Sequence, residues 1–369
     1  MNLVMVLAAT FVPCVLLLAV LARSAPELGL IDRPSGHKTH ELPTPVVGGL
    51  AMALSLLVVP ALGLLPPKGE WLYVGIAAMG LIGLVDDRWQ LSARVKLTLM
   101  ACAFTVVLYL SDLLLLNLGE LLPGVSVATG IIAFPLTLFA AVGLVNAFNL
   151  IDGVDGLAGT VAMCQLLVMF FIAQTIGADE WGPFIVAALA VVTAFLCFNM
   201  RLPKRQRARL FMGDTGSLVM GFILFWLSVS LSQRESGAVS PMLMVWVMAY
   251  PMVDTVATMV LRLGRGKSIF TPGKDHFHHL LSRLGLRTES VVGVCAVLTA
   301  ALGSVGVLLW WSGLPEWISL LLFVGFSALY VTVVTWTWRS LERAEYGDVR
   351  SNSPNTSNTP SIANRQLVR

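Results

Sequence analysis

Long apolar runs alternate with short polar gaps along most of the chain. Each run predicts a membrane-spanning helix, because a helix crosses the apolar core of a bilayer with about 20 apolar residues. The eleven runs cover 2–22, 46–65, 71–85, 94–111, 127–145, 158–176, 183–199, 217–232, 240–261, 291–311 and 317–337. The pattern therefore predicts an all-α polytopic membrane protein with about 11 transmembrane helices.

The composition agrees with this pattern and leaves little room for a separate soluble domain. Hydrophobic residues make up 57% of the 369 residues and charged residues 12%, against about 25% charged residues in an average soluble domain. We therefore expect one integral-membrane domain over residues 1–341, with its active-site loops on the cytoplasmic side. From residue 342 the chain is rich in Ser, Asn, Thr and Pro without an apolar period, which predicts a disordered cytoplasmic tail over 342–369.

The basic residues divide the polar gaps into two classes. All but two of the 24 Lys and Arg residues lie in alternate gaps or in the C-terminal tail, and the exceptions are Lys68 and Arg234. By the positive-inside rule the basic gaps face the cytoplasm, so the N-terminus lies outside and the C-terminus inside. Because the charges follow topology, the net charge of +3 does not indicate nucleic-acid binding. The five cysteines lie inside apolar runs without CxxC spacing, which argues against disulfides and thiolate metal sites.

The first basic gap is a loop rich in Pro and Gly that carries Lys38 and His40. Both side chains could contact a phosphate group. A basic loop that only sets the topology explains the same residues equally well, and the sequence leaves both interpretations open.

The second basic gap follows a pair of adjacent carboxylates, Asp86 and Asp87. Two neighbouring carboxylates repel each other unless a cation lies close by. A divalent metal would resolve the repulsion, and so would the basic side chains of Arg88, Arg94 and Lys96.

The third gap on this side contains no basic residue but carries four polar side chains, Asn146, Asn149, Asp152 and Asp155. The two asparagines are three positions apart, so they share one face at the end of a helix. Carboxylate and amide oxygens suit a hard cation such as Mg²⁺, which keeps several waters and shares phosphate oxygens with a substrate. This gap favours a ligand site over a simple turn between spans.

The fourth and fifth gaps each carry a further motif. In the fourth, Asp214 lies in a Gly-Asp-Thr-Gly-Ser segment that opens a predicted helix, where free backbone N–H groups favour anions. The fifth contains His276, His278 and His279. No Cys or Glu is spaced to complete a tetrahedral zinc site with them, so contact with phosphate is the better interpretation.

One carboxylate lies deeper in the predicted bilayer. Asp254 is about two helical turns inside the cytoplasmic end of the ninth apolar run. A charged side chain in the middle of a membrane span raises the free energy of insertion by about 2.5–3.5 kcal/mol on insertion scales. We therefore expect it to face the bundle interior and to have a partner. Both a structural hydrogen bond and a catalytic role remain open.

Taken together and in order, these motifs resemble those of the polyprenyl-phosphate N-acetylhexosamine-1-phosphate transferases, the superfamily that includes MraY and WecA. The matching segments are Asp86-Asp87, Asn146 to Leu157, Gly213 to Ser217 and His276 to His279. The likeness runs over about residues 1–340. The segment Asp275 to His279 and the Pro251-x-x-Asp254 element resemble the WecA branch in particular.

The resemblance implies an enzyme of the bacterial cytoplasmic (inner) membrane. Such enzymes transfer N-acetylglucosamine 1-phosphate from UDP-N-acetylglucosamine to undecaprenyl phosphate and release UMP. The lipid-linked product starts a surface glycan such as O-antigen. UDP-N-acetylgalactosamine and a rarer UDP-linked deoxy-amino sugar remain open as the donor, and a homodimer remains open as the assembly.

The resemblance also implies residue roles. Asn149 and Asp214 would hold Mg²⁺, with Mn²⁺ as an alternative, and Asp86 and Asp87 would flank the lipid phosphate, one of them as a base. Lys96 would contact phosphate. The residues expected to bind substrate are Lys38, His40, Asn146, Asp152, Asp155, His276, His278 and His279.

A transporter of nucleotide sugars or lipid carriers is the rival interpretation. Transporters place their substrate sites near the bilayer midplane, between inverted repeats. Here the carboxylates gather at one membrane surface and no repeat is visible in the sequence. The pattern therefore favours the enzyme.

Overall fold

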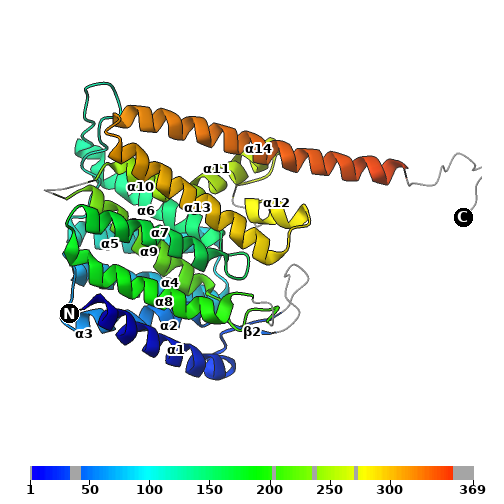
Figure 1. Ribbon diagram of the computed structural model, residues 1–369. Helices are drawn as coiled ribbons and strands as arrows, with labels where there is room; N and C mark the ends of the chain where they lie inside the picture. Colours follow the sequence, from blue (N-terminus) through cyan, green and yellow to red (C-terminus); the bar gives the residue numbers. More distant parts are fainter. Residues whose placement is uncertain (1, 34–42, 202–204, 235–238, 270–272, 352–369) are drawn as a thin grey trace, which may run out of the picture.

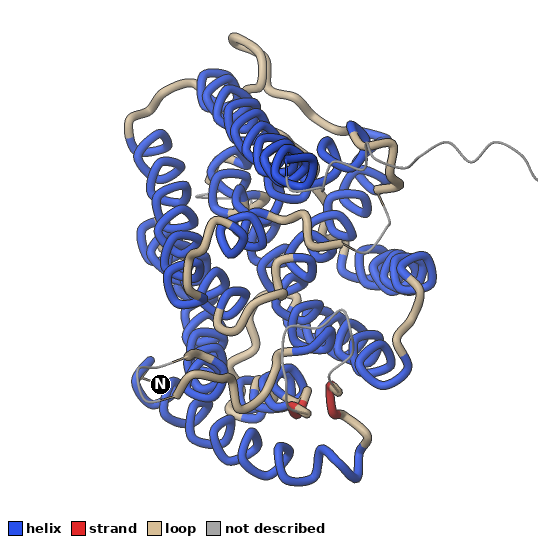
Figure 2. Tube along the Cα trace, turned by 90° about the vertical axis from the view of Figure 1, so that its right-hand side faces the viewer, coloured by secondary structure: helices blue, strands red, loops and turns tan. Residues whose placement is uncertain are grey.

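The computed structural model describes residues 2–33, 43–201, 205–234, 239–269 and 273–351, and it is a bundle of helices (Figures 1 and 2). Within these ranges, nine helices are long and apolar enough to cross a membrane. They are α1 (Leu3–Leu28), α4 (Gly69–Trp89), α5 (Ala93–Ser111), α6 (Ala133–Leu150), α7 (Leu157–Thr175), α8 (Gly182–Asn199), α9 (Gly213–Ser232), α13 (Thr288–Trp311) and α14 (Glu316–Ser351). The protein is thus an all-α polytopic membrane protein.

A tenth span results if α10 (Pro241–Val247) and α11 (Ala249–Gly264), which are bent by 70° against each other, count as one. The short helix α12 (Phe277–Arg283) precedes α13. Two 3₁₀ turns, η1 (Gly130–Ile132) and η2 (Asp179–Trp181), lead into α6 and α8. In the described part of the chain the only sheet is a two-residue antiparallel pair, β1 (Ile31–Asp32) with β2 (Thr44–Pro45).

The predicted span over 46–65 is broken into α2 (Gly48–Ser55) and α3 (Val58–Ala61). Pro60 explains the break, because it has no N–H to donate to the carbonyl of Leu56 and its ring clashes with that carbonyl. The Leu56 carbonyl instead accepts the backbone N–H of Val59 at 3.1 Å and the hydroxyl of Tyr73 at 2.8 Å. The structure therefore supports nine or ten full-length spans and does not confirm the predicted eleven.

The centre of the bundle is α9, which packs against α2, α4, α6, α7 and α10. The apolar stretch of α9 is 94% buried inside the bundle. The apolar stretches of α1, α5 and α14 are only 22% buried, so these helices lie at the periphery. The contact between α2 and α9 is so close that a Cβ atom on Gly49 would lie 2.0 Å from the backbone nitrogen of Gly216. Large apolar side chains on the outer surface, such as Phe139 and Tyr109, are exposed, as expected for contact with lipid.

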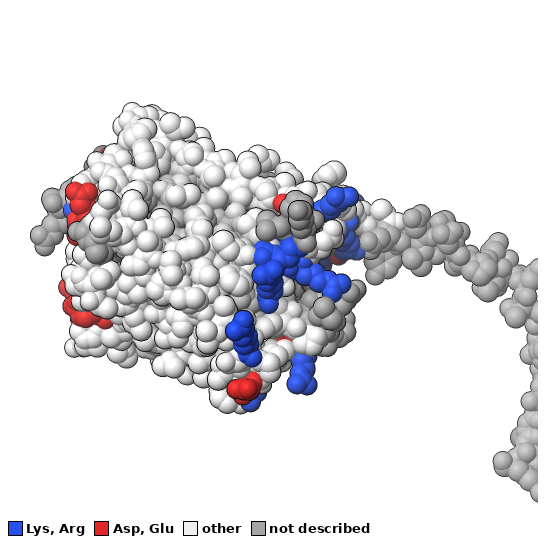
Figure 3. Space-filling view, turned by 60° about the horizontal axis from the view of Figure 1, so that its bottom comes forward, with Lys and Arg blue, Asp and Glu red and all other residues white. Residues whose placement is uncertain are grey.

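Charged residues gather at the two ends of the bundle, and most Lys and Arg side chains in view lie at one end (Figure 3). We call this the basic end; there α4 and α6 finish and α5, α7 and α9 begin. Lys68 and Arg234, the two basic residues outside the alternate gaps, lie at the opposite end and have partners there. Lys68 donates to the carbonyl of Asp112, 2.9 Å away, and Arg234 forms an ion pair with Glu180.

The last helix extends past the predicted domain boundary. We expected a disordered tail from residue 342, but α14 continues to Ser351, so the predicted boundary falls within a helix. Arg265 helps to hold this part of α14, because it donates to Glu342 at 2.5 Å and lies over the ring of Trp338. The rest of the predicted tail, 352–369, lies outside the described residues.

Candidate active site

Asp87, in the last turn of α4, caps the N-terminus of α9. Its carboxylate accepts hydrogen bonds from the backbone N–H groups of Asp214 (2.7 Å) and Thr215 (3.0 Å) and from the Thr215 hydroxyl (2.6 Å). The first N–H groups of a helix have no partner within the helix, and they favour a negative charge. Gly213 has φ +74°, and a Cβ atom there would lie 2.4 Å from Val46 Cγ1 and 2.7 Å from Asp87 Oδ2. Asp87 and Gly213 together therefore fix the start of α9 and the position of Asp214 in its first turn.

Lys96, near the start of α5, lies where three oxygen ligands meet. Its Nζ is 2.8 Å from Asp86 Oδ2, 3.1 Å from Asn149 Oδ1 and 2.9 Å from Asp214 Oδ1. Asp86 is buried, and its other oxygen accepts the backbone N–H of Leu91 at 2.6 Å. Residues from α4, α5, α6 and α9 thus form one cluster around a cationic group.

Asn149 connects Asp214 to the interior of the bundle. Its side-chain Nδ2 donates to Asp214 Oδ1 at 2.5 Å and to the buried hydroxyl of Ser217 at 2.7 Å. Ser217 in turn donates to the carbonyl of Gly213 at 3.0 Å. Asp214 is the more exposed member of the cluster, with 29% of its side chain accessible against 6% for Asp86. It is therefore the carboxylate that a soluble ligand reaches most easily.

The loop between α6 and α7 contains two carboxylates with different surroundings. Asp155 accepts from Arg201 Nε at 2.8 Å and from the backbone N–H of Ala208 at 3.4 Å, so it ties this loop to the basic gap after α8. The Asp152 backbone N–H donates to the carbonyl of Asn149 at 3.2 Å, but its carboxylate makes no hydrogen bond with another described residue. Burial raises the pKa of Asp152 to about 8, and the nearby negative charges of Asp214, Asp87 and Asp155 add to this effect. A cation bound nearby would therefore stabilise the charged form of Asp152.

The three histidines lie at the start of α12. Nδ1 of the buried His276 is 2.8 Å from Asp254 Oδ2, and the His276 ring stacks on that of His278 with 5.7 Å between centroids. His278 is fully buried, and neither ring nitrogen has a hydrogen-bond partner among the described residues. Burial, with the neighbouring histidines, lowers the pKa of His278 well below its usual value. The pKa of His279 falls to about 4 through burial and the nearby His276 and Lys274, so both rings are neutral near pH 7.

The histidine segment and the carboxylate loop are in contact. A Cβ atom on Gly153, directly after Asp152, would lie 2.7 Å from Nε2 of His278. Asp152 also interacts electrostatically with Asp214 and Asp87. The cluster around Lys96, the loop after α6 and the histidine segment therefore form one continuous region at the basic end.

Other predicted site residues are less closely tied to this region. Asn146 lies in α6 and is half-buried, and its side chain makes no hydrogen bond with another described residue. Lys38 and His40 lie outside the described residues. Sequence reasoning assigned no role to Thr215 or Ser217, although both lie in the Gly-Asp-Thr-Gly-Ser motif and contact the cluster. Their position in that motif was the available signal.

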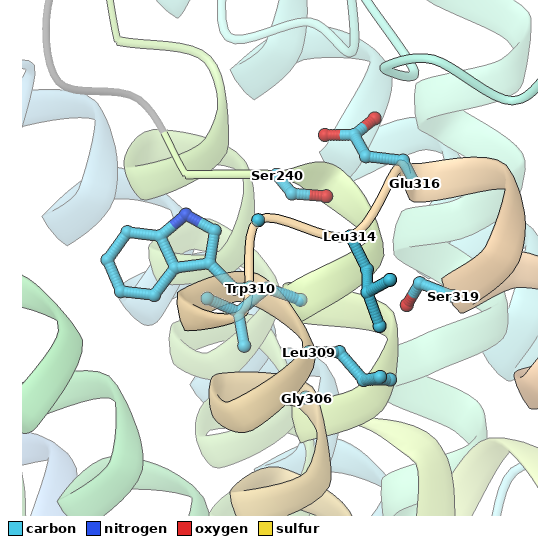
Figure 4. A pocket seen from close by; sticks show the side chains of 9 residues that line it. Ser240, Gly306, Leu309, Trp310, Leu314, Glu316 and Ser319 are labelled. Atoms are coloured by element: carbon cyan, nitrogen blue, oxygen red, sulfur yellow. The ribbon is translucent and has the colours of Figure 1, made fainter. Parts of the chain in front are cut away.

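Two cavities occur at the opposite end of the bundle. One, of about 200 Å³, lies between α10, α13 and the start of α14, and its lining includes Ser240, Trp310, Glu316 and Ser319 (Figure 4). The other, of about 580 Å³, shares Ser240 and Glu316 with it. Neither cavity is lined by a predicted site residue. The candidate site is therefore the polar cluster at the basic end.

Comparison with known proteins gives the same assignment as the motifs. The family described as glycosyl transferase family 4 matches residues 71–232, which include the Asp86–Asp87 pair, the Asn149 loop and Asp214. The chain is 31% identical to the undecaprenyl-phosphate α-N-acetylglucosaminyl 1-phosphate transferase of Escherichia coli K12, over 85% of this chain and 86% of the relative. It is 28% identical to the protein of the same name from Haemophilus influenzae, over 89% and 93% of the two chains. Because it is 31% identical to the Escherichia coli protein over most of both sequences, the protein belongs to the family of these sugar 1-phosphate transferases, and residues 71–232 match glycosyl transferase family 4.

Proposed function

We propose that the protein transfers N-acetylglucosamine 1-phosphate from UDP-N-acetylglucosamine to undecaprenyl phosphate. An oxygen of the lipid phosphate attacks the sugar-linked phosphorus, a new P–O bond forms, and the bond from that phosphorus to UMP breaks. The names of the relatives support the acceptor and the sugar. The observation that carries the proposal is the meeting of Asp86, Asn149 and Asp214 at the ammonium group of Lys96.

Charge neutralisation is the main task of such a site, because the reaction brings two anions together. Lys96 supplies a fixed positive charge, and Asp86 and Asp214 keep its ammonium group near the start of α9. The N-terminal end of α9 also favours anions. These groups suit the phosphates of both substrates.

The residues Asp214 and Asn149 fit a magnesium ion, which we propose as the cofactor, with Mn²⁺ as the alternative. Their oxygens already meet at a cationic group, 2.9 and 3.1 Å from Lys96 Nζ. Among the residues that the structure describes, no group of three or more His, Cys, Asp or Glu side chains could hold a metal. Two protein ligands suit Mg²⁺, which keeps waters and shares phosphate oxygens. When bound, the ion would neutralise charge on the pyrophosphate of the donor.

Asp86 and Asp87 act in this proposal by positioning other groups and not by removing a proton. A phosphate monoester has its second pKa near 6, so much of the lipid phosphate is a dianion at pH 7. Asp87 already accepts three hydrogen bonds at the start of α9, and Asp86 holds Lys96. Protonation of either carboxylate would weaken these contacts, which is why we assign both a positioning role.

We further propose that the basic end faces the cytoplasm of a bacterial inner membrane, with the N-terminus outside and the C-terminus inside. The gathering of Lys and Arg at that end supports this orientation (Figure 3). In an eleven-segment topology, α2 and α3 together would form the remaining, short and broken span. The donor would reach the site from the cytosol, and the product would start a lipid-linked surface glycan.

The test is release of UMP by purified protein in nanodiscs, given several UDP-sugars and undecaprenyl phosphate. We expect UMP release with UDP-N-acetylglucosamine only when the lipid phosphate is present. Faster turnover of UDP-N-acetylgalactosamine would change the assigned sugar. Absence of UMP with every donor would refute the transferase proposal and favour a transporter.

A further inference from the structure

One face of α11 holds the histidine segment in place. Asp254, Thr258 and Arg262 are spaced four residues apart, so they lie on the same side of the helix, and all three are buried. Thr258 Oγ1 lies 3.2 Å from Nδ1 of His276. Arg262 Nε donates to Asp275 Oδ2 at 3.1 Å. We call these three residues the α11 support.

The centre of this support is the carboxylate of Asp254, which is fully buried. It accepts the backbone N–H of Phe277 at 2.9 Å and the hydroxyl of Tyr330 at 3.1 Å, and its Oδ2 lies 2.8 Å from Nδ1 of His276. A buried charge is stable only when it is well paired and hydrogen-bonded. An ionised Asp254 can only accept, so the hydrogen between it and His276 belongs to Nδ1.

This arrangement engages Nδ1 of His276 and leaves Nε2 as the ring nitrogen without a hydrogen-bond partner among the described residues, on a side chain that is 3% exposed. The second ring, His278, is parallel to that of His276 within 6° and has its Nε2 against Gly153. The His278 ring thus acts as a spacer between His276 and the loop that carries Asp152. The orientation of His276 is therefore set from one side by Asp254 and from the other by His278.

The last transmembrane helix supports the same segment from a second direction. Tyr330 of α14 donates to Asp254, as described above. Arg265 donates to Asp275 at 2.7 Å and to Glu342 of α14 at 2.5 Å. The charges of Arg262 and Arg265 lower the pKa of Asp275, although its partial burial acts in the opposite direction.

We infer that Asp254 is a positioning residue for transfer: it keeps the hydrogen on Nδ1 of His276 and presents Nε2 to a phosphate of the nucleotide-sugar donor. The inference rests on the proposed function, because it assigns the donor pyrophosphate as the group that His276 meets. A carboxylate behind a functional histidine commonly fixes its tautomer and orientation in this way. Asp254 itself does not touch the substrate.

The decisive variant is Asp254→Asn, which keeps the side-chain volume but can donate from its amide to Nδ1. We expect kcat/KM for UDP-N-acetylglucosamine to fall by about 10–100-fold, the usual loss when a carboxylate behind a ligand histidine is removed. In a His276→Gln background the same substitution should cause little further loss, because Asp254 acts through His276. The matched control is Tyr250→Phe, which also changes a buried polar group of α11. The Tyr250 hydroxyl donates to Cys295 Sγ and not to the histidine segment. It should retain wild-type kcat/KM.

A second measurement separates positioning from a general structural role. With ¹⁵N-labelled histidine, the ring signals of His276 are identified by their loss in His276→Gln, since the chain has only five histidines. We expect the hydrogen to be on Nδ1 in the wild type and to move to Nε2 in Asp254→Asn. If Asp254→Asn does not fold, Tyr330→Phe replaces it, with an expected loss of a few fold that also disappears in the His276→Gln background.

An unchanged tautomer in Asp254→Asn, or losses that add fully in the double variant, would overturn the inference. Failure of the proposed function gives a different result. In that case the wild type releases no UMP, while the histidine signals still report whether Asp254 determines the tautomer of His276.

Discussion

The substitution Asp87→Asn tests whether the second carboxylate of the pair positions α9 or acts as a base. Asp87 accepts two backbone N–H groups and one hydroxyl at the start of α9. An asparagine keeps one acceptor, so it can still accept the N–H of Asp214. Its NH₂ group then faces the N–H of Thr215, and one helix donor loses its partner.

The cost of that change follows from the lost contacts. A buried donor without a partner costs about 1–3 kcal/mol, and removing a negative charge from a helix N-terminus costs about 0.3–1 kcal/mol more. If the lost contacts displace Asp214, the activation free energy rises by the same total of about 1–4 kcal/mol, which corresponds to a loss of roughly 10–1,000-fold in kcat. The loss should be the same at every pH at which the wild type is active, because no proton transfer has been removed.

The assay is the rate of UMP release between pH 6 and pH 9 for Asp87→Asn and for Gly213→Ala. The alanine perturbs this contact without changing any charge, since at a φ of +74° its Cβ would lie 2.7 Å from Asp87 Oδ2. It would also lie 2.4 Å from Val46 Cγ1, so Val46 must shift as well. Gly80→Ala is the control on α4, because its Cβ would meet only Val219 Cγ2 at an ordinary 3.6 Å. Both test variants should show losses independent of pH, and the control should show none. If the rate of Asp87→Asn instead recovers tenfold per pH unit, Asp87 is a base and our reasoning is wrong.

Four further predictions concern the metal, the loop after α6, the reaction path and the topology. Asp214→Asn should abolish turnover and weaken binding of Mn²⁺ measured by electron paramagnetic resonance, and unchanged Mn²⁺ affinity would refute its role as a ligand. Because the pKa of Asp152 is raised to about 8 in the folded protein, from a usual value near 3.9, its ionisation destabilises the fold as pH rises through that window. In EDTA, Asp152→Asn should therefore gain thermal stability over the wild type between pH 4 and pH 8, and an equal difference at both ends would contradict this. Exchange of labelled UMP into UDP-N-acetylglucosamine should require polyprenyl phosphate or the lipid product, whereas exchange in delipidated protein would indicate a covalent intermediate. Single cysteines at Gln206 or Thr288 should be shielded from an impermeant thiol reagent in intact cells, and one at Gly69 should react; the reverse pattern would invert the topology.

Sequence patterns predict the helical membrane architecture well, because a hydrophobic run is a local signal of bilayer insertion. The apolar run by itself does not predict the break between α2 and α3, since it continues through Pro60; the signal for the break is the proline. The motifs also locate the residues that meet around Lys96, although the contacts between Asp87 and Thr215 or between Lys96 and Asp214 join residues more than 100 positions apart. Such pairings depend on how the helices pack.

Hydrogen-bond partners decide what the motif residues can do, and a motif does not record them. Asp155 belongs to the same motif as Asp152, but it pairs with Arg201 and anchors a loop. The expected partner of Asp254 proved to be His276, which lies 22 positions along the chain. The sequence showed that Asp254 needed a partner because of its depth in the membrane, but it could not show which one.

The Asp86–Asp87 pair shows why adjacency in sequence misleads in a helix. The two carboxylates look like a unit that needs a shared cation, yet successive side chains on a helix with 3.6 residues per turn point about 100° apart. Asp86 faces Lys96, and Asp87 faces the backbone N–H groups of α9. Their mutual repulsion is therefore met by two separate positive groups, an ammonium ion and a helix N-terminus. Those two groups flank Asp214, so the pair can align the site without a metal or a proton between its own members.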